Sequence, residues 1–488
     1  MSVFWQVLSR NHNWKWSLAN LICVVVGCLI YLPSLNLFPS LDDFYLLAHT
    51  FNLQTGWDIL QPREHLFRPL EQLAITVNTN LLGFDSFWLI WIIQILAHSL
   101  SILLIINIGR KIHLSPPVVL GGGVFFAVLS VNSTALLQID TTSQTYSTVF
   151  ILIVYYLWLG MNWEKCNSFW TPLLAGLASL IALFWKETAI GPLLGISLLT
   201  LMLFIRNKVP LPVVIRFLMI VVVMPFAIYV ITRWLVGGVF QMSEGRYHLS
   251  LGLNVIKNVF MLLGGLLYQG STLDIFPTIN SNRFALGFAL SFFYSLWLGW
   301  SLWLLFRHKG PQIGHLTGTV IMLFASFFPV ILSQRVGEVY FYGTAPFLVL
   351  VLMLLMDHFL HAHQAAFVVF LFFVILTLNQ VVGTLDKQSK MMKIDKLSQY
   401  YTEQACDIYT KLPKDAILCW QNGQEHKPEY SLMVQDHITI YRPVSYFCAN
   451  ILTNNIQVLD AKKQTDLEQC TYFIREQNDE ELIFVKNE

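Results

Sequence analysis

The chain has 488 residues, of which 55% are hydrophobic and only 12% are charged, and its net charge is +1. A soluble protein carries about 25% charged residues, so this composition excludes an ordinary soluble enzyme and indicates a polytopic membrane protein. The near-zero net charge gives no sign of a nucleic-acid partner.

Apolar segments predict eleven transmembrane spans. The first, residues 17–35, is long enough to cross the bilayer and has no cleavage site after it, so we interpret it as a signal anchor with a cytoplasmic N-terminus. The others cover residues 85–108, 116–131, 144–161, 170–185, 187–205, 211–235, 284–306, 314–332, 339–356 and 364–384.

Residues 253–268 are the ambiguous segment. As a twelfth span they would move the basic residues at 307–309 to the outer side. Short loops rich in Lys and Arg are typical of the cytoplasmic side. We therefore interpret residues 253–268 as a helix on the outer surface, within an outer loop of residues 236–283.

The charged residues divide the chain into two parts. Residues 385–488 hold 28 of the 59 charged side chains. This predicts an all-α transmembrane body over residues 1–384, followed by a small soluble α/β domain outside the cytoplasm.

The tail pattern is a helix over residues 387–411, then short strands at 416–420, 438–441 and 456–459. Two apolar runs, residues 472–475 and 482–485, flank a polar turn and predict a closing hairpin. Four cysteines would permit two disulfides in an oxidising compartment, or act as small buried hydrophobes; they are Cys406, Cys419, Cys448 and Cys470.

Acidic residues of the body gather on one side. With eleven spans, eleven of the thirteen Asp and Glu residues before residue 385 face outward. Acidic residues at a membrane usually face a cavity, an ion or a substrate. The one-sidedness therefore indicates chemistry at the outer face.

The first outer loop, residues 36–84, contains the adjacent pair Asp42 and Asp43. A carboxylate here could accept the proton of an attacking hydroxyl. Adjacent residues on a loop point apart, so only one of the two is expected to be the base. Alternatively, the pair caps a short helix over residues 44–53, since Asp is a favoured capping residue. A second short helix is expected at residues 69–82.

Further charged residues could complete a site. Arg68 could neutralise an aspartate, bind a phosphate or anchor at the interface, and Glu71 follows it in the same loop. Lys186 and Glu187 lie between two apolar runs with almost no loop. They form either an anchoring pair or part of a cavity in which Lys186 binds phosphate.

Two outer turns add candidates. The turn between two later spans contains Arg335, Glu338 and Tyr340. An arginine suits a leaving phosphate because its guanidinium stays charged and can donate two parallel hydrogen bonds to it. Tyr340 and Tyr342 could instead belong to the aromatic belt, which we favour for Tyr342. Asp140 is the only charge in the polar turn of residues 131–144, which is either an acceptor pocket or a plain solvated loop.

The motifs resemble those of the GT-C superfamily of membrane glycosyltransferases, both in their order along the chain and in the side of the membrane on which they are expected. The resemblance is strongest to the protein O-mannosyltransferase-like and bacterial lipid-carrier-dependent branch. The resemblance covers residues 17–384 and is carried by residues 42–43, 67–70, 186–189 and 338–342. It implies a polyprenyl-phosphate sugar donor, Asp42 or Asp43 as the base, and Lys186 and Arg335 as phosphate binders. The family turn often reads Glu-Arg-Tyr-Leu-Tyr; Val339 stands where its Arg would be, and Arg335 is the substitute.

We therefore predict an inverting glycosyltransferase at the outer face of a bacterial inner membrane. Its partners would be membrane lipid, the lipid-linked sugar donor and an acceptor hydroxyl on a glycan, lipid or protein. No metal motif is found, and a divalent metal stays open as a cofactor. The alternatives are a transporter or flippase of lipid-linked sugars, which internal repeats would favour, and a non-catalytic envelope-assembly protein.

Overall fold

The computed structural model describes most of the helical body and parts of the tail. The described residues are 12–39, 43, 46–47, 58–62, 66–82, 87–161, 163, 169–206, 208–237, 252–267, 299, 313–328, 330–332, 338–361, 366–414, 416–420, 457–460, 470–477 and 481–486. The segments expected at residues 44–53, 284–306 and 438–441 lie wholly or largely outside them.

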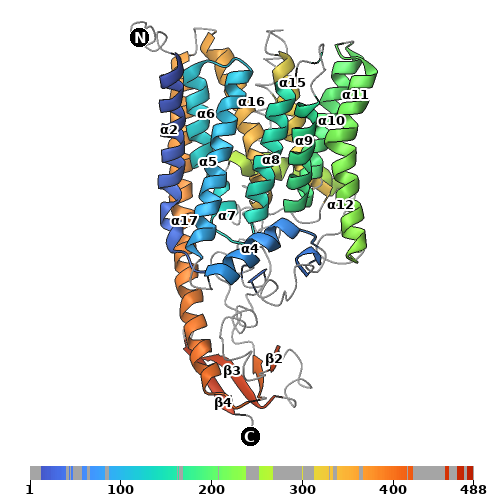
Figure 1. Ribbon diagram of the computed structural model, residues 1–488. Coiled ribbons are helices and arrows are strands. Elements are labelled where there is room, and N and C mark those ends of the chain that lie inside the picture. Colours follow the sequence, from blue (N-terminus) through green and yellow to red (C-terminus); the bar gives the residue numbers. More distant parts are fainter. Residues whose placement is uncertain are drawn as a thin grey trace.

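Apolar helices stand side by side and form a bundle (Figure 1). Their sequences are apolar on most faces, as expected for helices buried in protein or lipid. They are α2 (His12–Tyr31), α5 (Trp88–Lys111), α6 (Pro116–Val128), α8 (Thr142–Leu159), α9 (Trp170–Trp185), α10 (Ile190–Ile205), α11 (Leu211–Leu218), α12 (Met224–Leu235), α15 (Ile313–Phe327), α16 (Ala345–His361) and α17 (Ala366–Thr410).

Within the described residues, three helical segments are long and apolar enough by themselves to cross a membrane: Trp88–Lys111, Glu187–Ile205 and Leu211–Leu235. Several shorter apolar helices accompany them. The expectation of eleven spans therefore stays a prediction.

Close contacts between helices depend on glycine. A Cβ at Gly191 of α10 would lie 2.0 Å from the carbonyl oxygen of Phe328, just after α15. Small residues let membrane helices approach closely. Gly191 therefore fixes the distance between α10 and the end of α15.

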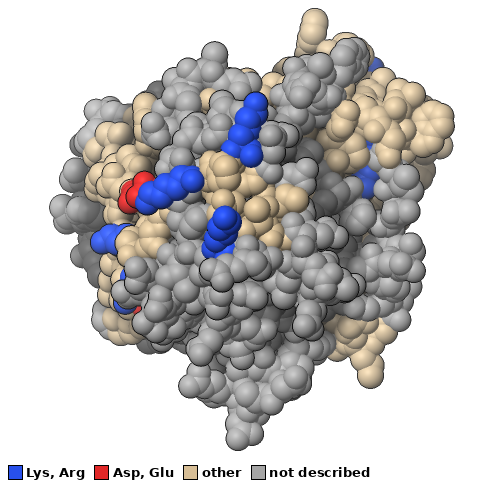
Figure 2. Space-filling view, turned by 90° about the horizontal axis from the view of Figure 1, so that it is seen from below, with Lys and Arg blue, Asp and Glu red and all other residues tan. Residues whose placement is uncertain are grey.

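One end of the bundle, here called the α4 end, carries the short elements. Helix α4 (Pro69–Leu82) lies across it, and the C-terminal sheet lies beyond it on the same side (Figure 1). Seen from below, this end shows several Lys and Arg side chains and few acidic ones among the described residues (Figure 2). The other short elements of the body are η1 (Leu32–Asn36), η2 (Asp58–Leu60), α7 (Asn132–Leu136), η4 (Glu187–Ala189), η5 (Met219–Val223), η8 (Val330–Leu332) and η9 (Glu338–Phe341).

The ambiguous segment forms α13 (Leu253–Leu267). Its Asn258 donates a hydrogen bond of 3.0 Å from Nδ2 to the carbonyl oxygen of Ile331 in η8. The ring of Phe341 lies so close to Gly265 that a Cβ there would be 2.5 Å from it. Helix α13 is thus tied to the segment that carries η8 and η9.

Helix α17 runs for 45 residues without interruption. The sequence predicted a span ending at residue 384 and a separate tail helix, so the expected break between the two is wrong. Side chains of α17 bind the turn after α6: Gln380 Oε1 accepts from the Ser130 amide at 3.0 Å, and Lys387 Nζ donates to the Ser130 carbonyl at 3.2 Å.

Beyond α17, four strands form one sheet in the order β2-β1-β3-β4. Strand β1 (Ile417–Trp420) is parallel to β2 (Gln457–Asp460) and to β3 (Tyr472–Gln477), and β3 is antiparallel to β4 (Glu481–Lys486). The predicted closing hairpin is confirmed. Cys406 and Cys470 are each disulfide-bonded. A separate extracytoplasmic domain over residues 385–488 stays a prediction.

Tyr342 does not lie in an interfacial belt. Its side chain is fully buried, and its hydroxyl is 2.9 Å from Nδ1 of the buried His98 in α5. Nε2 of His98 is 3.3 Å from the carbonyl oxygen of Ala127. Because a carbonyl can only accept, Nε2 carries the proton and Tyr342 donates to Nδ1. The hydroxyl explains why the tyrosine is internal: it has a buried partner.

Candidate active site

The first outer loop reaches the bundle through Arg68 and Glu71. Pro69 occupies the first turn of α4, a position that proline favours, and Arg68 directly precedes it. The Arg68 side chain is 8% exposed and binds Glu187 at two points, Nε to Oε2 at 3.1 Å and Nη2 to Oε1 at 2.9 Å. Glu71 Oε2 lies 3.8 Å from Arg68 Nη1. This bidentate pair fastens α4 to η4.

Lys186 is a buried cation, and among the described residues no carboxylate lies at contact distance from it. It ends α9 in extended conformation (φ −157°, ψ 132°), and only 2% of the residue is exposed. With the residues that the structure describes, it forms no ion pair and no side-chain hydrogen bond. Its ammonium lies 5.5 Å from the ring centre of Tyr340.

Burial lowers the pKa of the Lys186 ammonium to about 8, and the nearby Arg68 guanidinium acts in the same direction. The carboxylates of Glu187, Glu71 and Asp140 act in the opposite direction. The ammonium is therefore close enough to these acids to feel their charge, yet remains available to another anion.

Two carboxylates hold the polar turn between α7 and α8. Asp43 is 1% exposed, and its Oδ1 accepts the amides of Ile139 at 2.7 Å and Asp140 at 2.9 Å. Glu71 Oε1 accepts the Ser143 amide at 3.3 Å. Carboxylates that accept backbone amides satisfy groups which would otherwise be buried without partners.

This turn is not a plain solvated loop, so that alternative is wrong. Residues 130–145 are all buried, including Asp140. Several polar atoms there have no hydrogen-bond partner, and most buried polar atoms in proteins have one. In the part of the chain that the structure describes, these atoms include Ser133 Oγ, Ser143 Oγ, Gln144 Oε1 and, from the α16 side, Thr344 Oγ1.

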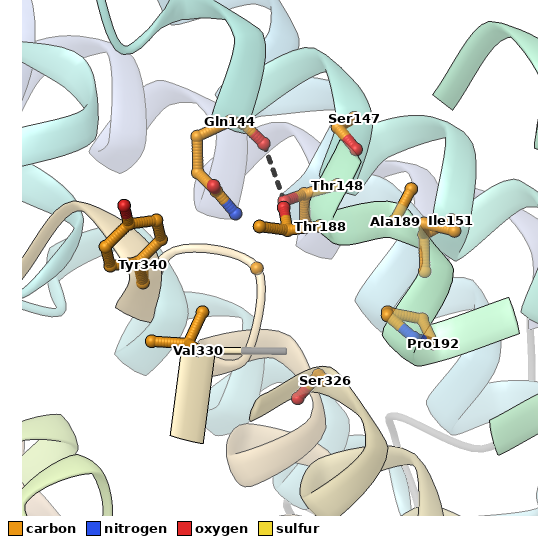
Figure 3. Close-up of a pocket in the computed structure, with 11 residues that line it drawn as sticks. Gln144, Ser147, Thr148, Ile151, Thr188, Ala189, Pro192, Ser326, Val330 and Tyr340 are labelled. Carbon is orange, nitrogen blue, oxygen red and sulfur yellow. Dashed lines mark hydrogen bonds between the residues drawn. The ribbon is translucent and has the colours of Figure 1, made fainter. Parts of the chain in front are cut away.

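A small pocket opens beside Tyr340, between α8, η4, α10 and α15 (Figure 3). Its polar lining comes from several hydroxyls and one amide, and none of the described lining residues is charged. The lining residues are Gln144, Ser147, Thr148, Ile151, Thr188, Ala189, Pro192, Ser326, Val330, Tyr340 and Gly343.

Most of the expected site residues meet at the α4 end. The structure brings together Asp43, Arg68, Glu71, Asp140, Lys186, Glu187 and Tyr340, which come from four separate segments of the chain. Asp42 and Arg335 lie outside the described residues. Glu338 begins η9, and its side chain is not described.

Sequence reasoning missed two residues of α12. Tyr229 lies close to the charged groups of Arg233 and Glu187. Its ring also contacts Phe67, with centres 5.5 Å apart. A signal was present: Arg233 is a buried arginine near the end of an otherwise apolar run, and such charges are rare in membrane helices unless they face the protein interior. Over the described residues, no three His, Cys, Asp or Glu side chains are grouped as metal ligands.

The architecture corresponds to the GT-C fold, as the sequence resemblance predicted. No family model matches the sequence, and no curated protein matches it. The apo crystal structure of ArnT from Cupriavidus metallidurans is similar, with a TM-score of 0.56 and 13% identity over 93% of this chain and 92% of that chain.

Two further solved structures support the assignment. ArnT bound to undecaprenyl phosphate matches with a TM-score of 0.50, at 13% identity and the same coverage. An Archaeoglobus fulgidus oligosaccharyltransferase, tethered to an acceptor peptide, matches with a TM-score of 0.52 and 11% identity over 95% of this chain and 69% of that chain. At these identities the similarity establishes the fold. Together with the apolar helices, it makes the chain an integral membrane protein.

Proposed function

We propose that the protein is an inverting glycosyltransferase, which moves a sugar from a polyprenyl-phosphate donor to an acceptor hydroxyl at the outer face of a bacterial inner membrane. The observation that carries the proposal is the ammonium of Lys186, which is buried and has no ion pair within the described part of the chain. A buried charge is costly unless it is compensated. A donor phosphate beside Tyr340 would compensate it.

The reaction needs a base and a stabilised leaving group. The acceptor hydroxyl oxygen bonds to the anomeric carbon while the bond from that carbon to the phosphate oxygen breaks. A carboxylate takes the hydroxyl proton, and the electron pair of the broken bond goes to the phosphate. A fixed cation at that phosphate stabilises the charge as it develops. Lys186 supplies this cation, and Arg335 is a second candidate.

Between the two aspartates, we assign the base to Asp42 and a positioning role to Asp43. Oδ1 of Asp43 accepts two backbone amides. An oxygen has two lone pairs, so Oδ1 is fully used and only Oδ2 of Asp43 could take a proton; we assign the base to Asp42 because Asp43 is committed to holding the turn. Arg68 is likewise occupied by Glu187 and Glu71. Its role here is therefore to hold α4 against η4 rather than to bind phosphate.

The related folds and the tail support the placement of the site. One solved relative was crystallised with undecaprenyl phosphate and another with an acceptor peptide. Disulfide-bonded Cys406 and Cys470 fit an oxidising compartment, because disulfides persist outside the cytosol. This supports a periplasmic tail, a cytoplasmic N-terminus and a site that faces the periplasm.

A transfer assay tests the proposal. The purified protein in nanodiscs receives undecaprenyl-phosphate-linked radiolabelled hexoses and bacterial envelope membranes as the acceptor source. Transfer is expected for the wild type and for Asp386→Asn, an exposed control in α17, and is lost in Asp42→Asn. Asp43→Asn keeps the amide-accepting oxygen and is expected to retain activity, whereas Asp43→Ala loses it. Absence of transfer by the wild type from every donor, or full activity of Asp42→Asn, contradicts the proposal.

A further inference from the structure

The pocket beside Tyr340 contains a buried amide without a complete set of partners. Gln144, in the first turn of α8, is only 4% exposed, and its Oε1 has no hydrogen-bond partner among the described residues. Its side chain points to the middle of the pocket, between Tyr340 and Thr188 (Figure 3). A buried, unsatisfied polar atom is costly unless a ligand or water meets it.

Gly343 keeps this amide in place. A Cβ on Gly343 would lie 2.5 Å from Nε2 of Gln144. Real Cβ atoms do not come so close, so any side chain at position 343 would displace the amide. The missing side chain therefore leaves both the amide and the space in front of it accessible from the pocket.

The pocket adjoins the cation of the proposed phosphate site. Tyr340 lines the pocket, and the ammonium of Lys186 lies 5.5 Å from the centre of its ring. Thr188 also lines the pocket, two residues after Lys186. A group attached to a phosphate at Lys186 would thus have this pocket within reach.

Size and charge restrict what the pocket takes. Its volume is about 20 Å³, which is room for about one water molecule. A whole sugar ring does not fit, whereas a single hydroxyl or hydroxymethyl oxygen does. Since none of the lining residues that the structure describes is charged, an ammonium or carboxylate would lose its hydration there without gaining a counterion.

We propose that Gln144 and the pocket kept open by Gly343 form a specificity subsite, which takes one neutral hydroxyl or hydroxymethyl group of the donor sugar. The inference rests on the proposed function and deepens it: the sugar is a neutral one, recognised by one oxygen at Gln144. The amide both donates and accepts, so it can satisfy that hydroxyl fully.

Binding measurements with matched donors test the subsite. The probes are undecaprenyl phosphate, its glucose and mannose conjugates, the 4-deoxy and 6-deoxy forms of each, and an amino-sugar conjugate. For the wild type, one neutral hexose donor is expected to bind at least about tenfold more tightly than its deoxy form, because a site built to pair a hydroxyl rejects the analogue that lacks it. The amino-sugar conjugate binds more weakly than that hexose.

Two variants locate the discrimination. Gln144→Leu removes the amide at similar size, and Gly343→Ala displaces it; both are expected to lose the preference for the hydroxyl. Gln399→Leu, on an exposed part of α17, is the control and keeps it. Binding of bare undecaprenyl phosphate stays unchanged in all three variants, which shows that each is folded.

The outcomes separate the two proposals. If the wild type binds undecaprenyl phosphate but does not distinguish any hexose from its deoxy forms, or if Gln144→Leu keeps the full preference, the subsite is refuted while the proposed function stands. If the pocket only holds water, Gly343→Ala also binds each hexose donor and its deoxy form as the wild type does, and this too refutes the subsite. If the wild type binds no lipid phosphate and transfers no sugar, both proposals fail.

Discussion

Lys186→Met is the substitution that most directly probes the site. Methionine keeps most of the length and apolar volume of the lysine stem and removes only the charged end. Lys186 has no ion pair with any residue that the structure describes, so the variant deprives none of the described carboxylates of a contact partner. The loss should therefore fall on the binding of an anionic ligand rather than on folding.

The size of the effect follows from burial. Two unit charges about 4 Å apart interact by about 4 kcal/mol at an effective dielectric constant of about 20. The carboxylates of Glu71, Glu187 and Asp140 also act on the ammonium. They weaken its attraction for a phosphate, and we take about half of the 4 kcal/mol as the lower limit of the interaction free energy. The expected loss is about 2–4 kcal/mol, or roughly 30- to 700-fold in the dissociation constant.

Calorimetric titration of the detergent-solubilised protein with undecaprenyl phosphate measures this loss. The matched control is Lys208→Met, since Lys208 is exposed in the loop between α10 and α11. Lys186→Arg keeps the charge and should retain most of the affinity. If Lys186→Met binds within about threefold of Lys208→Met, a difference below 1 kcal/mol, the lysine does not hold the phosphate.

The same interaction predicts a pH dependence. Because the pKa of Lys186 is lowered to about 8, the ammonium is present below this pH and is lost as the pH rises through it. Affinity for undecaprenyl phosphate should fall above pH 8 in the wild type, but not in Lys186→Arg, whose guanidinium stays charged. Equal pH profiles of these two proteins would contradict the assignment.

Two further changes test the framework of the site. Glu187→Gln breaks the bidentate pair with Arg68. Because the Glu187 side chain is 31% exposed, we expect the free energy of unfolding to fall by about 1–3 kcal/mol, which is less than for fully buried pairs. The change is measured as a lower Tm. In a double-mutant cycle with Arg68→Met, additive effects would show that the pair contributes nothing. Gly191→Ala places a methyl group against the carbonyl of Phe328 and should cost about 1–3 kcal/mol by overpacking; Gly314→Ala, which meets nothing within 4 Å, is the control, and equal Tm values would contradict the tight contact.

Many helix bounds could be predicted because the sequence marks them chemically. Helix α4 begins at Pro69, and α9 ends where Lys186 and Glu187 interrupt two apolar runs. The continuity of α17 was not predictable from hydropathy. A change from apolar to charged residues near 385 alters what surrounds a helix, but nothing there removes a backbone donor, so the helix continues.

The residues of the site could be predicted from the sequence, but which of them contact each other could not. The sequence placed Arg68 and Glu187 on the same side, yet 119 residues separate them. Only the packing of α4 across the bundle decides that they meet. Uncharged polar residues were harder still. The turn around Gln144 has the composition of a solvated loop, and its burial depends on carboxylates of Asp43 and Glu71 that reach it from another segment.

For the reaction that we propose, the charges of the site would favour the donor over the product. The donor that we propose, a polyprenyl-phosphate sugar, is a phosphodiester with one negative charge, which matches the one positive charge of Lys186. Cleavage leaves a phosphomonoester, which takes on a second charge close to Glu71, Glu187 and Asp140. Like charges at short range repel, most strongly where water is excluded. The acids that tune Lys186 would therefore also weaken the hold on the lipid phosphate after transfer, so that binding and release depend on the same cluster.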